Sequence, residues 1–311
     1  DMMGNTIHNW DMLERGYTMH HAISQDKQGN ILATVSKTSA KIANGKDVRI
    51  NDFIIRMDPE KGEILQEWDL VHMLDSARYG MTDYDLTSDP FAQSASNWAH
   101  NNGIVEWGDD YLATARYQGI FKFNKAGGIE WIISPHGYWR DKYLKLLLNP
   151  LHADGTPITD PEVIAGTKNC DDFEWPWGCH TAVPLPNGHI LYFNNGYGRN
   201  FKLDFTDRKN IYTCGIEYEV DEVNRTVRQV WQYGKERGAA YFTPARSGVQ
   251  YLEQTGNRLI CPGMSNVLSN GNRGARVTEV DPETQDVVFE LELEDAIYQR
   301  VYRMSLYPEN Q

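Results

Sequence analysis

The side chains best suited to chemistry in this chain are histidines, and they are unevenly distributed. All nine lie at or before His189, and residues 190–311 contain none. His100 lies in the run WAHNNG, and His180 lies in the run WGCHTA. Arg199 ends the run NNGYGR, whose glycines permit a tight reversal of the chain. Two imidazoles and a guanidinium that meet would suit an anionic group with several oxygen atoms.

Such residues can meet only on a scaffold that brings distant segments together, and the sequence contains a repeat that could do this. A turn followed by a strand that closes on a large aromatic side chain occurs five times. The aromatic residues are Trp10, Trp68, Trp131, Trp231 and Phe289. The strands before the turns alternate polar and apolar residues, as in FIIRMD at 53–58 and RVTEVD at 276–281, which indicates half-buried antiparallel strands.

Each repeat has a second half, in which a strand, a Gly-Asn type turn and another apolar strand follow one another. These strands open at His21, His180 and Ser247. A meander of about four strands cannot bury both faces alone, so the units must stack around an axis. We therefore predict an all-β fold, a β-propeller, with about five repeats in a single domain of residues 1–311.

The predicted propeller places the candidate residues together. The innermost strands of a propeller begin at one mouth of its central channel. His100 and His180 open equivalent strands in neighbouring repeats, so their side chains are expected to converge at that mouth. The reversal before Arg199 is expected to bring its guanidinium to the same place.

The longest spacing between the repeated aromatics, from Trp131 to Trp231, contains a segment rich in Pro, Gly, Trp and Asp at 135–178. One short helix is predicted in it, at 138–148. Long loops on a rigid scaffold often carry function. The tryptophans of this segment, which could line a site for an aryl group or pack as loop core, are Trp139, Trp175 and Trp177.

Composition narrows the classes of partner. The net charge of −13 argues against nucleic acid or an anionic membrane as the main partner, because both require basic surface. No apolar run of about 18 residues is present, so no membrane-spanning helix is predicted. Cys170 and Cys179 could form a disulfide in an oxidising compartment, but their spacing matches no standard zinc pattern. No metal site is predicted.

Several of these runs resemble the bacterial arylsulfate sulfotransferases, and the resemblance extends over nearly the whole chain. The runs are WAHNN at 98–102, WPWGCHTA at 175–182, LYFNNG at 191–196, VWQYGKERG at 230–238 and YRMSLY at 302–307. Members of that family are six-bladed periplasmic propellers, usually with a smaller N-terminal β-domain. The resemblance therefore implies that this chain lacks that domain and the first blade, and that the protein is periplasmic or secreted.

The resemblance implies transfer of a sulfuryl group from an aryl sulfate to a phenol, without a nucleotide donor or any other cofactor. In the family a histidine takes the group covalently, which predicts ping-pong kinetics. His100 and His180 match two of the family's active-site histidines, and one or the other would protonate the leaving phenolate and later deprotonate the incoming phenol. Arg199 matches the family's arginine, which binds sulfuryl oxygens. The expected partners are small aryl sulfates and phenols, and a homodimer is compatible with this.

The chain departs from the family pattern at the nucleophile. The stretch where the family carries its nucleophilic histidine reads GNRLICPG here, and our register places Cys261 at that position. Three interpretations stay open. A Cys261 thiolate could attack, or His20 or His21 could replace the missing group. Otherwise the propeller is catalytically inactive and binds a ligand or partner protein.

The remaining candidates are predicted substrate contacts. Arg116 and Tyr117 stand where the family tends to carry an Arg-His pair, although ordinary packing at a strand end would also explain them. The full set of predicted substrate contacts is His21, Asn101, Arg116, Tyr117, Trp177 and Asn194.

Overall fold

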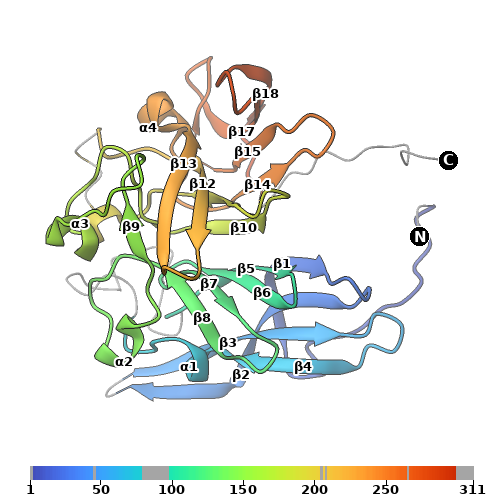
Figure 1. The fold of residues 1–311 in the computed structure, drawn as a ribbon. Coiled ribbons are helices and arrows are strands. Elements are labelled where there is room, and N and C mark those ends of the chain that lie inside the picture. The colour runs from blue at the N-terminus through green and yellow to red at the C-terminus, as the bar shows by residue number, and fades with distance from the viewer. Residues whose placement is uncertain are drawn as a thin grey trace.

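The computed structural model describes residues 3–44, 47–78, 98–203, 206, 209–264 and 266–298. Within these ranges the chain forms four β-sheets that follow one another along the sequence (Figure 1). The run at 302–307 lies outside the described residues. No helix in the described ranges is long and apolar enough to cross a bilayer.

The first two sheets are simple antiparallel meanders in chain order. The strands of the first are β1 (Thr18–Gln25), β2 (Ile31–Asn44), β3 (Asp47–Met57) and β4 (Ile64–Asp69). Those of the second are β5 (Asn101–Trp107), β6 (Asp110–Ala115), β7 (Gly119–Phe123) and β8 (Ile129–Ile133).

The last two sheets carry additions to the same meander. The third consists of β10 (His180–Pro184), β11 (Ile190–Asn194), β12 (Cys214–Asp221) and β13 (Thr226–Tyr233), with β9 (Asn149–Leu151) added in parallel to β13. The fourth consists of β14 (Ser247–Tyr251), β15 (Arg258–Pro262) and β17 (Arg273–Val280), with β16 (Asn266–Val267) and β18 (Val287–Glu294) both paired with β17. The strands predicted from alternation at 53–58 and 276–281 correspond to β3 and β17.

The helical elements are short and lie between or beside the sheets. They are α1 (Leu70–Met73), α2 (Asp141–Leu144), α3 (Pro161–Ala165), α4 (Gly238–Tyr241) and the 3₁₀ turns η2 (Arg199–Phe201) and η3 (Lys235–Arg237). α2 falls inside the range predicted to be helical. Asp160 caps the N-terminus of α3 through its side chain, and Gly166 ends that helix with a left-handed conformation.

The sheets are arranged as blades around an axis. The first strands of successive sheets are neighbours, since β1 contacts β5, β5 contacts β10 and β10 contacts β14. This arrangement confirms the predicted β-propeller. The described residues form four sheets, however, and not one for each of the five repeated aromatics. Among the described residues no strand precedes the first aromatic, Trp10, which packs on the turn between β3 and β4.

Apolar clusters fill the spaces between adjacent blades. Leu112 and Ile120 of the second sheet share one cluster with Tyr192 and Ile216 of the third. Similar clusters join the first sheet to the second and the third to the fourth. Because a blade is covered on both faces, β12 is buried at five consecutive residues, although its sequence alternates.

The repeated tryptophans link one blade to the next. Trp68 of β4 donates its indole N–H to the Lys125 carbonyl, at 3.0 Å, in the turn between β7 and β8. Trp131 of β8 donates to the Glu222 carboxylate, at 2.8 Å, in the turn between β12 and β13. Each indole therefore spans from the last strand of one blade to the last hairpin turn of the following blade.

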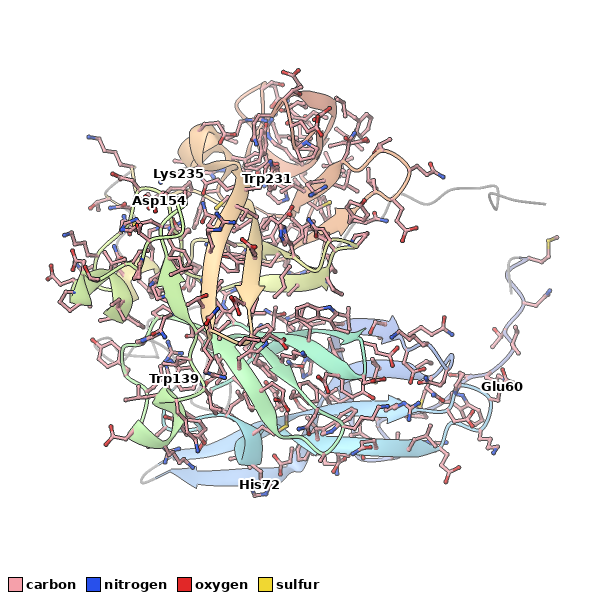
Figure 2. The ribbon with its side chains drawn as sticks, viewed as in Figure 1. Glu60, His72, Trp139, Asp154, Trp231 and Lys235 are labelled. Carbon is pink, nitrogen blue, oxygen red and sulfur yellow. The ribbon has the colours of Figure 1, made fainter. Side chains whose placement is uncertain are left out.

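Trp10 and Trp231, at the two ends of the series, also contact the last hairpin turn of the blade that follows them. Trp10 donates to the Pro59 carbonyl at 3.0 Å. Trp231 lies on β13 (Figure 2) and is 2.6 Å from the side-chain oxygen of Gln285 once that amide is oriented to suit its neighbours. We call these four contacts the tryptophan links. The turn approached by Trp10 requires glycine, because a Cβ on Gly62 would lie 2.5 Å from the indole.

The contact at Gly62 can be tested against a matched glycine. Gly62 and Gly108 have nearly equal φ angles, +64° and +66°, but a Cβ on Gly108 would meet nothing within 4 Å. We expect Gly108→Ala to lower the free energy of unfolding by about 1–2 kcal/mol, the cost of a left-handed residue. Gly62→Ala should cost about 1–3 kcal/mol more, because the methyl group displaces Trp10. Equal costs in urea denaturation would show that the link at Trp10 is not tightly packed.

Candidate functional site

The mouth of the propeller, where the inner strands begin, gathers one basic side chain from each blade. These side chains are His21, His100, His180 and Arg246. His21, His100 and Arg246 have positive φ angles of 54°, 53° and 59°. A left-handed conformation costs a non-glycine residue about 1–2 kcal/mol and redirects its side chain, as is common at functional sites.

The three histidines form a compact cluster. The Nε2 atoms of His21 and His100 are 3.1 Å apart, and their ring centroids are 4.6 Å apart. The His180 ring centroid lies 6.2 Å from that of His21. The structure thus brings His100 and His180 to one place, and His21 stands between them.

A chain of hydrogen bonds continues from this cluster to a buried carboxylate. His21 Nδ1 is 3.0 Å from His20 Nδ1. His20 Nε2 is 3.0 Å from Ser36 Oγ and 3.6 Å from Asp52 Oδ1. Ser36 donates to Asp52 Oδ1 at 2.8 Å. We call the series from His100 through His21 and His20 to Asp52 the histidine relay.

The carboxylate sets the direction of the histidine relay. The Asp52 carboxylate accepts from Ser36 Oγ, so Ser36 Oγ accepts from His20 Nε2–H, and His20 Nδ1 accepts from His21. His21 Nε2 then accepts from His100 Nε2–H. This leaves a lone pair on His100 Nδ1, a buried atom that has no hydrogen-bond partner among the described residues.

His180 is held separately, in a single tautomer. Its Nδ1 is 2.6 Å from the side-chain oxygen of Asn195 and 3.2 Å from the Gly178 carbonyl. The amide of Asn195 is oriented by its own donation to the Thr243 carbonyl at 2.9 Å. Both neighbours of Nδ1 are acceptors, so Nδ1 carries the proton and Nε2 carries the lone pair.

Arg116 supplies positive charge to all three histidines. Its guanidinium is buried, stacks 4.5 Å from the centroid of the Tyr197 ring and donates to the Pro244 carbonyl at 2.8 Å. Its charge lowers the pKa of His21, His100 and His180. Arg246, which is exposed, contributes in the same direction at His21.

Burial is the main cause of the low pKa of these histidines. His21 keeps exposed surface at the mouth, yet the surrounding protein, His20 and the two arginines lower its pKa to about 4. Burial, assisted by neighbouring cations, also places the pKa of His100 and of His180 well below the usual value of 6.5. All three imidazoles are therefore neutral at pH 7, and lone pairs remain on His100 Nδ1 and on His180 Nε2.

Arg199 does not lie where the sequence analysis expected. Its buried guanidinium forms an ion pair with Glu174 and stacks 3.8 Å from the centroid of the Tyr212 ring. It also donates to the carbonyls of Asn210 and Tyr212 at 3.2 and 3.3 Å. The reversal after β11 occurs as expected, but the buried carboxylate of Glu174 attracts the guanidinium, and this pair joins the long segment to the third blade.

The surroundings of Cys261 bear on the three interpretations of that position. Its side chain has no exposed surface and packs in an apolar cluster with Leu252, Leu259 and Val277. Such a position suits a small apolar residue. No disulfide links the four cysteines, all of which lie within the described residues.

The other predicted substrate contacts divide into two groups. Tyr117 lies near the cluster, with its ring centroid 6.1 Å from that of His100, and Asn101 donates its backbone N–H to Asp52 at 3.0 Å. Asn194 instead accepts from the backbone of Trp177 and donates to the Trp175 carbonyl, so its amide is occupied. The side chains that pack as loop core rather than as an open wall are Trp139, Trp175 and Trp177.

Two parts of this site were missed in the sequence, although a signal existed for one. Arg246 immediately precedes Ser247, which the repeat had already aligned with His21 and His180. Aligning the blades at that position would have found it. The link from His20 to Asp52 has no comparable signal, because it depends on the pairing of three strands, β1, β2 and β3, with Ser36 of β2 between the two residues.

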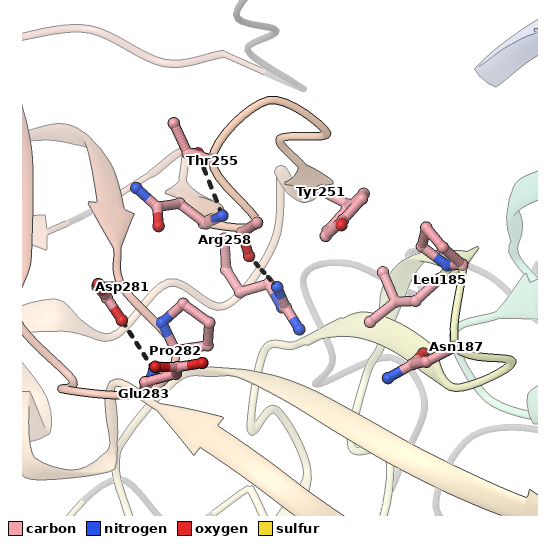
Figure 3. Close-up of a pocket in the computed structure, with 11 residues that line it drawn as sticks. Leu185, Asn187, Tyr251, Thr255, Arg258, Asp281, Pro282 and Glu283 are labelled. Carbon is pink, nitrogen blue, oxygen red and sulfur yellow. Dashed lines mark hydrogen bonds between the residues drawn. The ribbon is translucent and has the colours of Figure 1, made fainter.

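A surface pocket lies at the other end of the same strands. It has a volume of about 400 Å³ and lies between the third and fourth blades, where β10 ends and β14 turns into β15 (Figure 3). Residues lining it include Leu185, Asn187, Tyr251, Thr255, Arg258 and Pro282. Since the histidines stand at the beginnings of the inner strands, this pocket is separate from their cluster.

The placement of Arg199 gives a test of its role. We expect Arg199→Ala to lower the free energy of unfolding by about 3–5 kcal/mol, because Glu174 is left as an unpaired buried charge. The control is Lys168→Ala, which removes an exposed pair with Asp160 and should leave the free energy of unfolding almost unchanged. If Arg199→Ala keeps full stability and loses only activity, Arg199 acts on substrate instead.

The solved structures that resemble this chain do so only distantly. A propeller described as "Structure of Dos1 propeller" is 8% identical and covers 90% of this chain and 63% of its own, with a TM-score of 0.34. A europium-containing methanol dehydrogenase is 10% identical and covers 89% of this chain and 49% of its own, with the same TM-score.

Comparison of sequences is more informative. The arylsulfate sulfotransferase AssT of Escherichia coli O6:H1 is 29% identical over 337 aligned residues, which cover 98% of this chain and 56% of the relative. AssT of Lelliottia amnigena is 30% identical over 338, with the same coverage. The chain thus spans about half the length of these curated relatives. The profile of the arylsulfotransferase (ASST) family matches residues 1–303, and the chain belongs to that family.

Proposed function

We propose that this protein transfers a sulfuryl group from an aryl sulfate to a phenol at the histidine cluster. The observation that carries the proposal is the set of neutral imidazoles beside Arg116, one of them held with a lone pair on Nε2. Sulfuryl transfer, like phosphoryl transfer, depends mainly on positioning and on cationic donors to the peripheral oxygens. Membership of the arylsulfotransferase family supports the same reaction class.

His180 is the nucleophile in this proposal. The lone pair on Nε2 forms a bond to sulfur while the sulfur–oxygen bond to the aryl group breaks, and the electrons of that bond leave with the phenolate. The N–H on Nδ1 stays bound to Asn195, which stabilises the positive charge that develops on the ring. In this proposal Arg116 and Arg246 bind the sulfuryl oxygens and the departing phenolate.

The histidine relay serves the second half of the reaction. The oxygen of the acceptor phenol attacks sulfur, the bond from sulfur to His180 breaks, and the phenolic proton passes to His100 Nδ1. Each member of the relay then donates one proton onward, so positive charge moves toward Asp52. The carboxylate stabilises that charge, and the proton later returns to water.

The periplasmic or secreted location and a homodimer stay predictions.

Removing the nucleophile is the first test. With 4-nitrophenyl sulfate and phenol, we expect His180→Asn to lower kcat/KM by at least about a thousandfold, since a nucleophile acting with its partners is worth more than that. His72→Asn is the matched control, because that imidazole is 82% exposed and lies on α1, outside the cluster. No acceptor-dependent release of nitrophenolate by the unaltered protein would instead favour a non-catalytic binding propeller.

The relay makes a separate prediction through Asp52. We expect Asp52→Asn to lower the acceptor step by about 10²–10⁴-fold, with the larger losses for phenols of higher pKa. The initial burst of nitrophenolate should be almost unchanged, since the donor step does not use the relay. The control is Asp26→Asn, a buried carboxylate paired with Arg56 at the turn after β1. Equal losses in both steps would mean that Asp52 only supports the fold.

A further inference from the structure

A second group of reactive side chains lies outside the histidine cluster, on the long segment between β8 and β10. His152 follows β9, and Cys170 and Asp172 follow α3. One ligand atom from each of the three lies within 4.8 Å of the others. Asp154, on the same loop as His152, marks this region at the side of the molecule near β9 and α3 (Figure 2).

The three side chains already contact one another. His152 Nδ1 is 2.9 Å from Asp172 Oδ1, and the Cys170 thiol is 3.1 Å from the same oxygen. Each side chain is partly exposed, so an ion could enter from solvent. An imidazole, a thiolate and a carboxylate are the three ligand types that zinc takes in proteins.

The surroundings fix these ligands in place. The backbone N–H of Ala153 donates to Asp172 Oδ2 at 2.9 Å, which orients the carboxylate as outer partners of metal ligands do. β9, just before His152, is paired with β13. Phe173, just after Asp172, is buried and stacks on Tyr218 at 5.7 Å between centroids. Both chain segments that supply ligands are therefore anchored to the third blade.

We propose that His152, Cys170 and Asp172 bind a divalent transition-metal ion, with zinc preferred. A thiolate and a carboxylate balance the charge of the ion, and the thiol proton is released to water when the metal–sulfur bond forms. A fourth position is left for water or for Asp154, whose carboxylate interacts electrostatically with both His152 and Asp172. Softness of the sulfur ligand favours zinc over magnesium or calcium.

The ion would act as a clip on the segment that leads to the candidate nucleophile. It joins His152 to Cys170 and Asp172, and eight residues later the chain reaches His180. Between them, Glu174 pairs with Arg199. Closing a loop of this kind removes conformational freedom from the unfolded chain, so zinc should raise the midpoint of thermal unfolding.

Cobalt reports on this site directly, because a thiolate bound to Co²⁺ gives a charge-transfer absorption that histidine ligands alone do not give. We would add Co²⁺ to the reduced, chelator-treated protein. The unaltered protein and Asp171→Asn, which changes the adjacent exposed carboxylate, should both show the band, and zinc should remove it. Cys170→Ser should show no band, and His152→Gln should bind at least about tenfold more weakly.

Absence of the band from the unaltered protein with excess cobalt would overturn the proposal. Persistence of the band in Cys170→Ser would also overturn it. Binding of cobalt without a thiolate band would place the ion on other ligands and would equally refute this site. Circular dichroism of each variant establishes that it is folded. The readout uses no substrate, so its failure is distinct from a failure of the sulfotransferase proposal.

Discussion

The contact on which the arrangement of this molecule depends is the link from the indole of one blade to the last turn of the next. Apolar clusters hold neighbouring blades together, but the hydrophobic effect itself is not directional. The hydrogen bonds of Trp68 and Trp131 are directional, and each joins an outer strand to a specific turn. The tryptophan links therefore add a specific, directional contact at the outer edge of each of these interfaces.

The arrangement of the blades brings together a cluster of imidazoles whose pKa values are lowered. Histidines from three blades come together where the surrounding protein and Arg116 disfavour positive charge, so their neutral form is favoured. Neutral imidazole is a better nucleophile and base than imidazolium. Positive φ angles at His21 and His100 show that the backbone accepts strain to direct these side chains at the mouth. Stability is thus lost locally where reactivity is gained.

Much of the fold could be predicted because the repeat consists of residue types with strong local structural preferences. Alternating strands and turn glycines gave the blades, and the register of His100 and His180 placed them at one mouth. Arg199 could not be placed, since its partner Glu174 lies 25 residues earlier in a segment without repeat character. The surroundings of Cys261 could not be predicted for a related reason. Alignment gives the position of a residue along a strand, whereas the packing of Leu252 and Val277 around it determines how accessible the side chain is.

The central claim is that His180 Nε2 carries the sulfuryl group between donor and acceptor. The most direct measurement is peptide mapping by mass spectrometry after brief exposure of the protein to 4-nitrophenyl sulfate, with no phenol present, under conditions that preserve sulfuryl–imidazole bonds. The peptide containing His180 should gain the mass of one sulfuryl group and lose it when phenol is added. A modification found on Cys261, on His21 or on no residue would contradict the claim.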